Sequence, residues 1–220
     1  MDTPPADGIE LSRDEIDRLL HELSDVLAER GQQVSVYVVG GANIALAFDA
    51  SRTTTDIDVV AQRGLEALEA ASATVAERNP GIRADWINPD FTGGDRRGGI
   101  TWSWFDHKGL DEPRTYLQSP SLTVKLAGPE MMLALKTIAA RDKDMSDIAL
   151  LMEKTGIRTR QQLGDNIKKF TGERIFQAEG RPGNFVHVVA SINEVSARLS
   201  PARRALAPAG LLGRLFRRRK

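Results

Sequence analysis

The chain of 220 residues contains no cysteine, and only 5% of its residues are aromatic. The absence of cysteine excludes disulfide bonds, thiolate metal ligands and a cysteine nucleophile. No stretch is long and apolar enough to span a membrane, which argues against a membrane partner. The first residues, Met-Asp-Thr-Pro-Pro, also lack the basic and apolar regions of a secretory signal. We therefore expect a cytoplasmic protein.

Charge is balanced overall but unevenly placed. The chain has 30 basic and 30 acidic residues, yet residues 201–220 hold seven bases and no acid. The rest of the chain is left with 23 bases and 30 acids. A basic end on an acidic body is typical of an interaction segment. This tail could contact nucleic-acid phosphates, dock on an anionic membrane, or simply keep the chain soluble.

Hydrophobic periodicity predicts helices that alternate with strands early in the chain and dominate later. We expect helices at 13–30, 42–48, 65–78, 129–141, 145–154, 159–168 and 185–199. We expect strands at 34–39, 57–60, 82–87, 100–105 and 122–126. This order indicates an α/β (α+β) domain at 1–156, a helical extension at 157–200 and a flexible basic tail at 201–220.

The most informative chemical pattern joins two glycines to two aspartates. Gly40 and Gly41 follow the first predicted strand, and Asp56 and Asp58 open the second. On a strand, the two carboxylates share one face with their Cα atoms about 6.5–7 Å apart, close enough to converge on a divalent cation. A glycine turn before a helix presents backbone N–H groups to a phosphate. The pattern predicts chemistry on a nucleoside triphosphate; the alternatives are a plain turn and a solvent-facing strand edge.

These residues resemble a known family. The stretch from Gly40-Gly41 to Asp56-Ile57-Asp58 is similar to the opening of the DNA polymerase beta-like nucleotidyltransferases. It resembles more narrowly the AbiEii-like minimal nucleotidyltransferases of prokaryotic toxin–antitoxin and phage-defence systems. Segments 85–88 and 130–148 carry the narrower resemblance, which covers roughly residues 35–155. It implies a polymerase beta-like core, with a mixed sheet flanked by helices.

One position departs from the wider superfamily, which usually has serine where this chain has Gly41. The missing hydroxyl would remove one side-chain hydrogen bond to a triphosphate, although backbone N–H groups could still serve. By the same resemblance, Gly40 and Gly41 would position the β- and γ-phosphates. Arg52 and Arg141 are further candidates for phosphate contact.

The resemblance also implies a metal site. Asp56 and Asp58 would hold Mg²⁺, or Mn²⁺, against the triphosphate, where the metal neutralises charge and activates the attacking hydroxyl. Polymerase-like sites add a third carboxylate on a neighbouring strand. Asp85, on the predicted strand at 82–87, is the candidate for that third metal ligand; its alternative is a surface acid at a strand edge.

A second group of candidates lies later in the chain. On an uninterrupted helix, Asp147 would lie about 20° around the axis from Lys136, on the same stripe. The resemblance implies that Lys136 binds triphosphate oxygens as a point charge, while Asp147 or Asp144 orients Lys136 or the acceptor. The alternative is a solvated helix face with surface salt bridges.

The implied reaction moves a nucleoside monophosphate from an NTP to an acceptor hydroxyl and releases pyrophosphate. The acceptor would be a tRNA 3′ end or a protein hydroxyl. The setting would be a toxin or defence component with a cognate antitoxin protein. The competing hypotheses are a catalytically inactive relative that binds a nucleotide or a partner, and an interaction module that uses the basic tail.

Overall fold

The computed structural model describes residues 9–89, 114–171 and 182–199, which fall into two compact units. Residues 9–89 and 114–128 belong to the first unit, and residues 129–171 and 182–199 to the second. The sequence places the end of the core at residue 156, whereas the contacts divide the chain between Gly128 and Pro129. The boundary comes earlier because the helix that starts at Pro129 packs on the helices that follow it.

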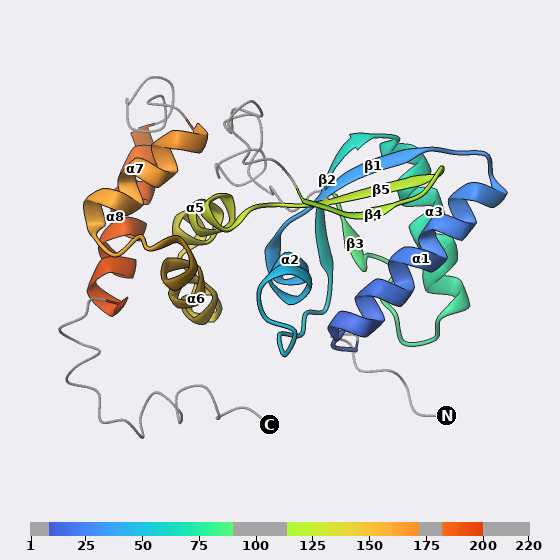
Figure 1. Ribbon diagram of the computed structural model, residues 1–220, viewed down its shortest axis with the longest axis horizontal. Coiled ribbons are helices and arrows are strands. Elements are labelled where there is room, and N and C mark those ends of the chain that lie inside the picture. Colours follow the sequence, from blue (N-terminus) through green and yellow to red (C-terminus); the bar gives the residue numbers. More distant parts are fainter. Residues whose placement is uncertain (1–8, 90–113, 172–181, 200–220) are drawn as a thin grey trace. The chain divides into compact units, whose positions relative to one another are not determined.

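The first unit contains a mixed sheet of strand order β3-β2-β1-β5-β4 in the described residues (Figure 1). The strands are β1 Val34–Val38, β2 Ile57–Arg63, β3 Ile87–Asn88, β4 Arg114–Gln118 and β5 Leu122–Leu126. β1 runs antiparallel to β2 and parallel to β5, β3 runs parallel to β2, and β4 runs antiparallel to β5. This arrangement confirms the predicted mixed sheet flanked by helices.

The helices of the first unit are α1 Arg13–Glu29, α2 Gly40–Ala47 and α3 Leu65–Arg78. α1 begins with a capping box, in which Ser12 and Glu15 bond each other's backbone N–H groups. α1 and α3 lie side by side (Figure 1) and bury their apolar faces against alternate residues of β1 and β5. Each fully buried Leu or Val in this core stabilises the fold by about 1.5–3 kcal/mol.

Two strand predictions differ from the structure. The third strand is only Ile87–Asn88, and the residues before it form turns. The guanidinium of Arg83 donates two hydrogen bonds, of 2.7 and 2.6 Å, to the carboxylate of Asp85. These bonds favour a turn over an extended strand. β4 was not predicted, because its side chains are exposed or half-buried and give no strong apolar pattern. The strand expected at 100–105 lies outside the described residues.

The second unit is helical in the part that the structure describes. Its elements are α5 Pro129–Ala139, η3 Asp142–Asp144, α6 Met145–Thr155, α7 Arg160–Thr171 and α8 Pro182–Leu199. α5 packs against α6, α7 and α8. Thr159 caps α7, because its hydroxyl accepts the N–H of Gln162 at 3.2 Å. None of the helices in the described ranges is long and apolar enough to cross a membrane.

The helix does not continue from Lys136 to Asp147, in agreement with the two separate helices predicted at 129–141 and 145–154. α5 ends at Ala139, and Ala140 has a φ of 44°, in the left-handed region that non-glycine residues rarely adopt. The 3₁₀ turn η3 then leads directly into α6. The chain therefore folds back, and α6 packs on α5 instead of extending it.

Candidate functional site

The glycine pair forms the first turn of α2, directly after β1. Gly40 has a φ of 66°, a conformation that favours glycine. A Cβ at Gly40 would collide with Oδ2 of Asp58 and would lie 3.1 Å from that residue's Cβ. Both the backbone and the neighbouring carboxylate therefore require glycine here. The predicted glycine turn and the predicted metal ligand Asp58 are in direct contact.

The start of α2 is suited to an anion. The first N–H groups of a helix have no partner within the helix, and they carry partial positive charge. Val39, which precedes the helix, has an apolar side chain that cannot cap them. Gly40 and Gly41 are half-buried, so this turn is not sealed inside the core. A phosphate could therefore be bound by backbone groups at this point.

The two predicted aspartates are fixed by different donors. Asp58 lies on β2, on the face opposite to the buried Ile57 and Val59, and its Oδ1 accepts the Asn88 side-chain amide at 3.0 Å. Asp56 lies directly before the strand, and its Oδ1 accepts the Thr54 hydroxyl at 3.3 Å. Both carboxylates are half-buried. They are held in place, yet they remain accessible.

The donor set fits a magnesium ion that arrives with its substrate. Mg²⁺ is typically bound by one or two carboxylates together with substrate phosphates and water. Asp56 and Asp58 supply the carboxylates, and the space at Gly40 that a Cβ would fill lies against Asp58. Within the described residues, no group of three His, Cys, Asp or Glu side chains is placed to hold a metal by itself. The arrangement therefore suits a metal–nucleotide complex better than a permanently bound ion.

Asp85 is not brought together with this pair. It lies in the turn before β3, with 66% of its side chain exposed, and it pairs with Arg83 at 2.6 Å. The hydrogen bonds from Arg83 lower the pKa of the Asp85 carboxyl below its ordinary value. The residue opposite Asp58 in the β2–β3 register is Asn88, which sequence reasoning missed. A strand of two residues has no periodicity that could have identified it.

Arg52 lies at the glycine turn. Its Nη2 is 3.9 Å from the position of a Cβ on Gly41, and its Nη1 donates to the Thr53 carbonyl at 2.5 Å. A guanidinium beside the first turn of a helix adds positive charge where an anion would bind. The structure thus places Arg52 with Gly41, while its contact with phosphate stays a prediction.

Asn43 is a further residue that sequence reasoning missed. Its side chain is fully buried, and its Nδ2 donates to the carbonyls of Val38 at 2.8 Å and Ala127 at 3.3 Å. These carbonyls lie at the ends of the parallel strands β1 and β5, so Asn43 ties the first turns of α2 to both. Its polar character could have marked it, because it lies within the otherwise apolar run Ala42–Leu46.

The later candidates meet within the second unit. Lys136 is 5% exposed, and its Nζ lies 2.7 Å from Asp144 Oδ1 and 3.0 Å from Asp147 Oδ2. Arg141 donates from Nε to the other oxygen of Asp144 at 2.6 Å. Burial alone would raise the pKa of Asp144, but the hydrogen bonds from Arg141 and Lys136 outweigh burial and lower that pKa.

The cluster of Lys136, Arg141, Asp144 and Asp147 is not the solvated helix face that the alternative interpretation expected. Asp144 and Asp147 are 0% and 3% exposed, so the ion pairs are buried. Lys136 and Asp147 do meet as predicted, but through the packing of α6 on α5. Their predicted cooperation with Asp56 and Asp58, which belong to the first unit, stays a prediction.

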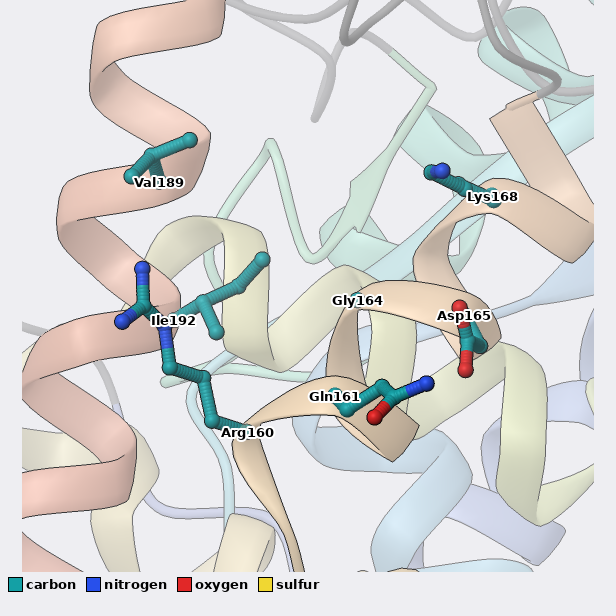
Figure 2. A pocket seen from close by; sticks show the side chains of 7 residues that line it. All are labelled: Arg160, Gln161, Gly164, Asp165, Lys168, Val189 and Ile192. Atoms are coloured by element: carbon teal, nitrogen blue, oxygen red, sulfur yellow. The ribbon is translucent and has the colours of Figure 1, made fainter.

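A hollow of about 340 Å³ lies between α7 and α8. Figure 2 shows Val189 and Ile192 of α8 on one side, Gln161, Asp165 and Lys168 of α7 on the other, and the Arg160 side chain extending from α7 toward α8. Arg160, Asp165 and Lys168 give the α7 side mixed charge. None of the residues that line it was predicted as a site residue.

No family profile matches this chain, and no curated protein matches it. One solved structure that aligns with it is an antigenic nucleotidyltransferase-like protein from Paracoccidioides brasiliensis. The alignment covers 82% of this chain and 94% of that one, at 17% identity and a TM-score of 0.41. At that level the similarity assigns neither family nor function, and the functional conclusion depends on the geometry of the site.

Proposed function

We propose that this protein is a Mg²⁺-dependent nucleotidyltransferase that transfers a nucleoside monophosphate from an NTP to an acceptor hydroxyl. One observation carries the proposal: the carboxylate of Asp58 packs directly against Gly40 at the start of α2. A phosphate-binding turn and a metal-binding carboxylate therefore adjoin each other. Catalysis of phosphoryl chemistry depends mainly on positioning and on charge stabilisation, which are the two things that this arrangement offers.

Each residue has a defined task in this proposal. The backbone N–H groups of Gly40 and Gly41 bind the β- and γ-phosphates, and Arg52 neutralises part of their charge. Asp56 and Asp58 hold Mg²⁺, which supplies charge neutralisation at the transferred group. The acceptor hydroxyl loses its proton to water and its oxygen bonds to the α-phosphorus, while the bond from that phosphorus to the α,β-bridging oxygen breaks and pyrophosphate leaves.

The buried cluster of the second unit has a different task. Lys136 forms ion pairs with the carboxylates of Asp144 and Asp147, and these ion pairs stabilise the packing of α6 on α5. Arg141 bonds Asp144 while 55% of its side chain stays exposed. The bonds to Asp144 fix the position of Arg141, and its contact with phosphate stays a prediction.

The resemblance suggests the acceptor and the setting. A tRNA 3′ end or a protein hydroxyl would accept the nucleotide, and the basic residues at 201–220 would favour an RNA acceptor. A role as a toxin or defence component with a cognate antitoxin, in the cytoplasm, follows from the same resemblance.

Transfer of label tests the proposal. The protein would be incubated with Mg²⁺, with each of the four α-³²P-labelled NTPs in turn, and with total RNA or cell lysate. We expect one NTP to label an RNA or protein band. Asp56→Asn and Asp58→Asn should abolish labelling, whereas Asp85→Asn, which changes an exposed acid outside the pair, should retain it. Undiminished labelling by the Asp56→Asn/Asp58→Asn double variant would overturn the assignment of the site.

A second candidate function is nucleotide binding without turnover. It is favoured by Asn88, an amide in register with Asp58 where a third carboxylate would complete a polymerase-like site. Calorimetric titration with Mg²⁺ and NTP distinguishes the two functions. Tight binding by the wild-type protein, with no labelled product in any acceptor mixture, would favour the inactive binder.

A further inference from the structure

The side chain of Thr54 fills the space that a side chain on Gly41 would need. A Cβ built on Gly41 would lie 2.8 Å from Thr54 Oγ1 and 3.2 Å from Thr54 Cβ. The first distance is shorter than real Cβ contacts and the second is tight, so a side chain at residue 41 would force the Thr54 side chain to shift. A hydroxyl is therefore present beside the backbone of Gly41, and it belongs to Thr54.

Thr54 is held rigidly by its backbone. Its N–H donates to the Leu11 carbonyl at 3.1 Å, and its carbonyl accepts the Leu11 N–H at 2.6 Å. This isolated antiparallel bridge joins Thr54 to a residue that is only 1% exposed. A group that is fixed before its ligand arrives loses little conformational entropy on binding.

The hydroxyl of Thr54 points to Asp56. Oγ1 lies 3.0 Å from the Asp56 carbonyl oxygen and 3.3 Å from Asp56 Oδ1. A hydroxyl has one hydrogen to donate, so these two oxygens share it. Nη2 of Arg52 also lies within 3.9 Å of the position of a Cβ on Gly41. Thr54 thus touches the two elements of the site at once: the phosphate turn and the first aspartate.

We propose that Thr54 is a positioning residue, whose hydroxyl sets the Asp56 carboxylate beside Gly41 for binding of a metal–nucleoside triphosphate complex. This inference rests on the proposed function. The simpler possibility is that the hydroxyl only stabilises its own turn, as Ser and Thr often do by bonding the backbone two residues on. The two roles differ in what they need: a turn needs only stability, whereas positioning requires a hydroxyl at this place for nucleotide binding.

The steric conflict between a side chain at residue 41 and Thr54 suggests an exchange experiment. The variants are Thr54→Ala, Thr54→Ser, Gly41→Ser and the double variant Gly41→Ser/Thr54→Ala. The control is Thr53→Ala, which removes a neighbouring threonine whose hydroxyl bonds Glu10 at 2.8 Å instead of Asp56. The readouts are the dissociation constant of a fluorescent NTP in Mg²⁺, the direct binding of Mn²⁺ with that NTP by electron paramagnetic resonance, and the thermal unfolding temperature.

We expect Thr54→Ala to weaken binding of the metal–NTP complex about tenfold, the loss typical of one hydrogen bond to a charged group. Thr54→Ser should bind within about twofold of wild type, because it keeps the hydroxyl. Gly41→Ser should bind worse than Thr54→Ala, because its side chain collides with Thr54. The double variant should bind better than Gly41→Ser and approach wild type, since the hydroxyl has moved to residue 41. Thr53→Ala should bind like wild type.

Two results would overturn the role of Thr54 and leave the proposed function standing. In the first, Thr54→Ala binds the metal–NTP complex as tightly as wild type. In the second, the effects of Gly41→Ser and Thr54→Ala on binding simply add in the double variant. An unfolding temperature that falls in Thr54→Ala without any change in nucleotide binding would assign the hydroxyl to the turn. If the wild-type protein binds no metal–NTP complex at all, the proposed function fails, and this inference fails with it.

Discussion

The two compact units use carboxylates in opposite ways. In the sheet unit, Asp56 accepts a hydrogen bond from a neutral group, the hydroxyl of Thr54. In the helical unit, Asp144 is bonded by two cationic side chains, those of Lys136 and Arg141. A carboxylate that is held by neutral donors keeps its net charge, and a cation can still use it. A carboxylate that is held by cations has its charge already neutralised.

The carboxylates of the two units also differ in how deeply they are buried. The aspartates of the sheet unit are half-buried, whereas Asp144 and Lys136 are 0% and 5% exposed. Removing one partner of a buried ion pair leaves an uncompensated charge and costs about 3–5 kcal/mol. Removing a half-buried carboxylate leaves a polar site that water can reach. We therefore expect the sheet unit to lose function on substitution and the helical unit to lose stability.

The largest expected effect is on activity in the sheet unit. Asp56→Asn or Asp58→Asn should reduce nucleotidyl transfer by about a thousandfold, because the metal supplies several kcal/mol of charge stabilisation. The free energy of unfolding should change by no more than about 0.5–1 kcal/mol. Label transfer and denaturant unfolding measure the two quantities. A large loss of stability with retained activity would show that these aspartates serve the fold of the sheet unit and not its function.

The next effect is on stability in the helical unit. Lys136→Met should lower the free energy of unfolding by about 3–5 kcal/mol, because it leaves two buried carboxylates without their lysine partner. The matched control is Lys143→Met, which changes an exposed lysine in the adjacent 3₁₀ turn and should cost no more than about 0.5 kcal/mol. Urea titration of both variants provides the measurement. Equal stability of the two would show that the buried pairs contribute nothing.

A smaller effect separates backbone strain from side-chain collision at the glycine turn. Gly40 and Gly31 both have positive φ, 66° and 62°, but a Cβ on Gly31 would have nothing within 4 Å. Gly31→Ala should therefore cost only about 1 kcal/mol of backbone strain. Gly40→Ala should cost more by about 1–3 kcal/mol and should weaken nucleotide binding, because it displaces Asp58. Similar unfolding curves for the two variants would argue against the Asp58 contact.

The smallest effect is a difference in acid sensitivity. Because the folded state lowers the pKa of Asp144 below the ordinary 3.8, the unfolded chain binds the proton first as the pH falls. The stabilisation is therefore complete well above pH 3.8 and is lost as the pH falls through the lowered pKa. In urea titrations from pH 7 down to pH 3, the stability gap between wild type and Asp144→Asn should narrow toward acid. A gap that stays constant would exclude Asp144 as the titrating group.

The sequence correctly predicted those helices and strands that are defined by a local pattern of residues. α3 and β5 begin and end at the predicted residues, because apolar periodicity and turn residues define both ends. The short β3 was predicted too long, because Trp86 has strand character in the sequence but is held in the core by its bond to the Ser72 carbonyl at 3.0 Å. Such tertiary contacts leave no signal in a local pattern.

The same limit applies to the site. The paired aspartates and glycines were predicted because their spacing has chemical meaning by itself. Thr54 lies in a run of three threonines, and only tertiary contacts, such as its bridge to Leu11 and its approach to Gly41, distinguish it from its neighbours. Asn88 is distinguished only by its register with Asp58. Lys136 and Asp147 were paired on the assumption of a straight helix, and they meet because the chain breaks at Ala140 and folds back.

The bridge between Leu11 and Thr54 also determines when the site can form. The two residues lie on either side of α1, β1 and α2, so their hydrogen bonds close a long loop. Contacts between distant residues form late in folding, because the entropy of loop closure must be lost before they stabilise the chain. During synthesis, Asp56 and Asp58 would therefore emerge as ordinary acids. They would become a binding site only when the start of the chain had been folded back against them.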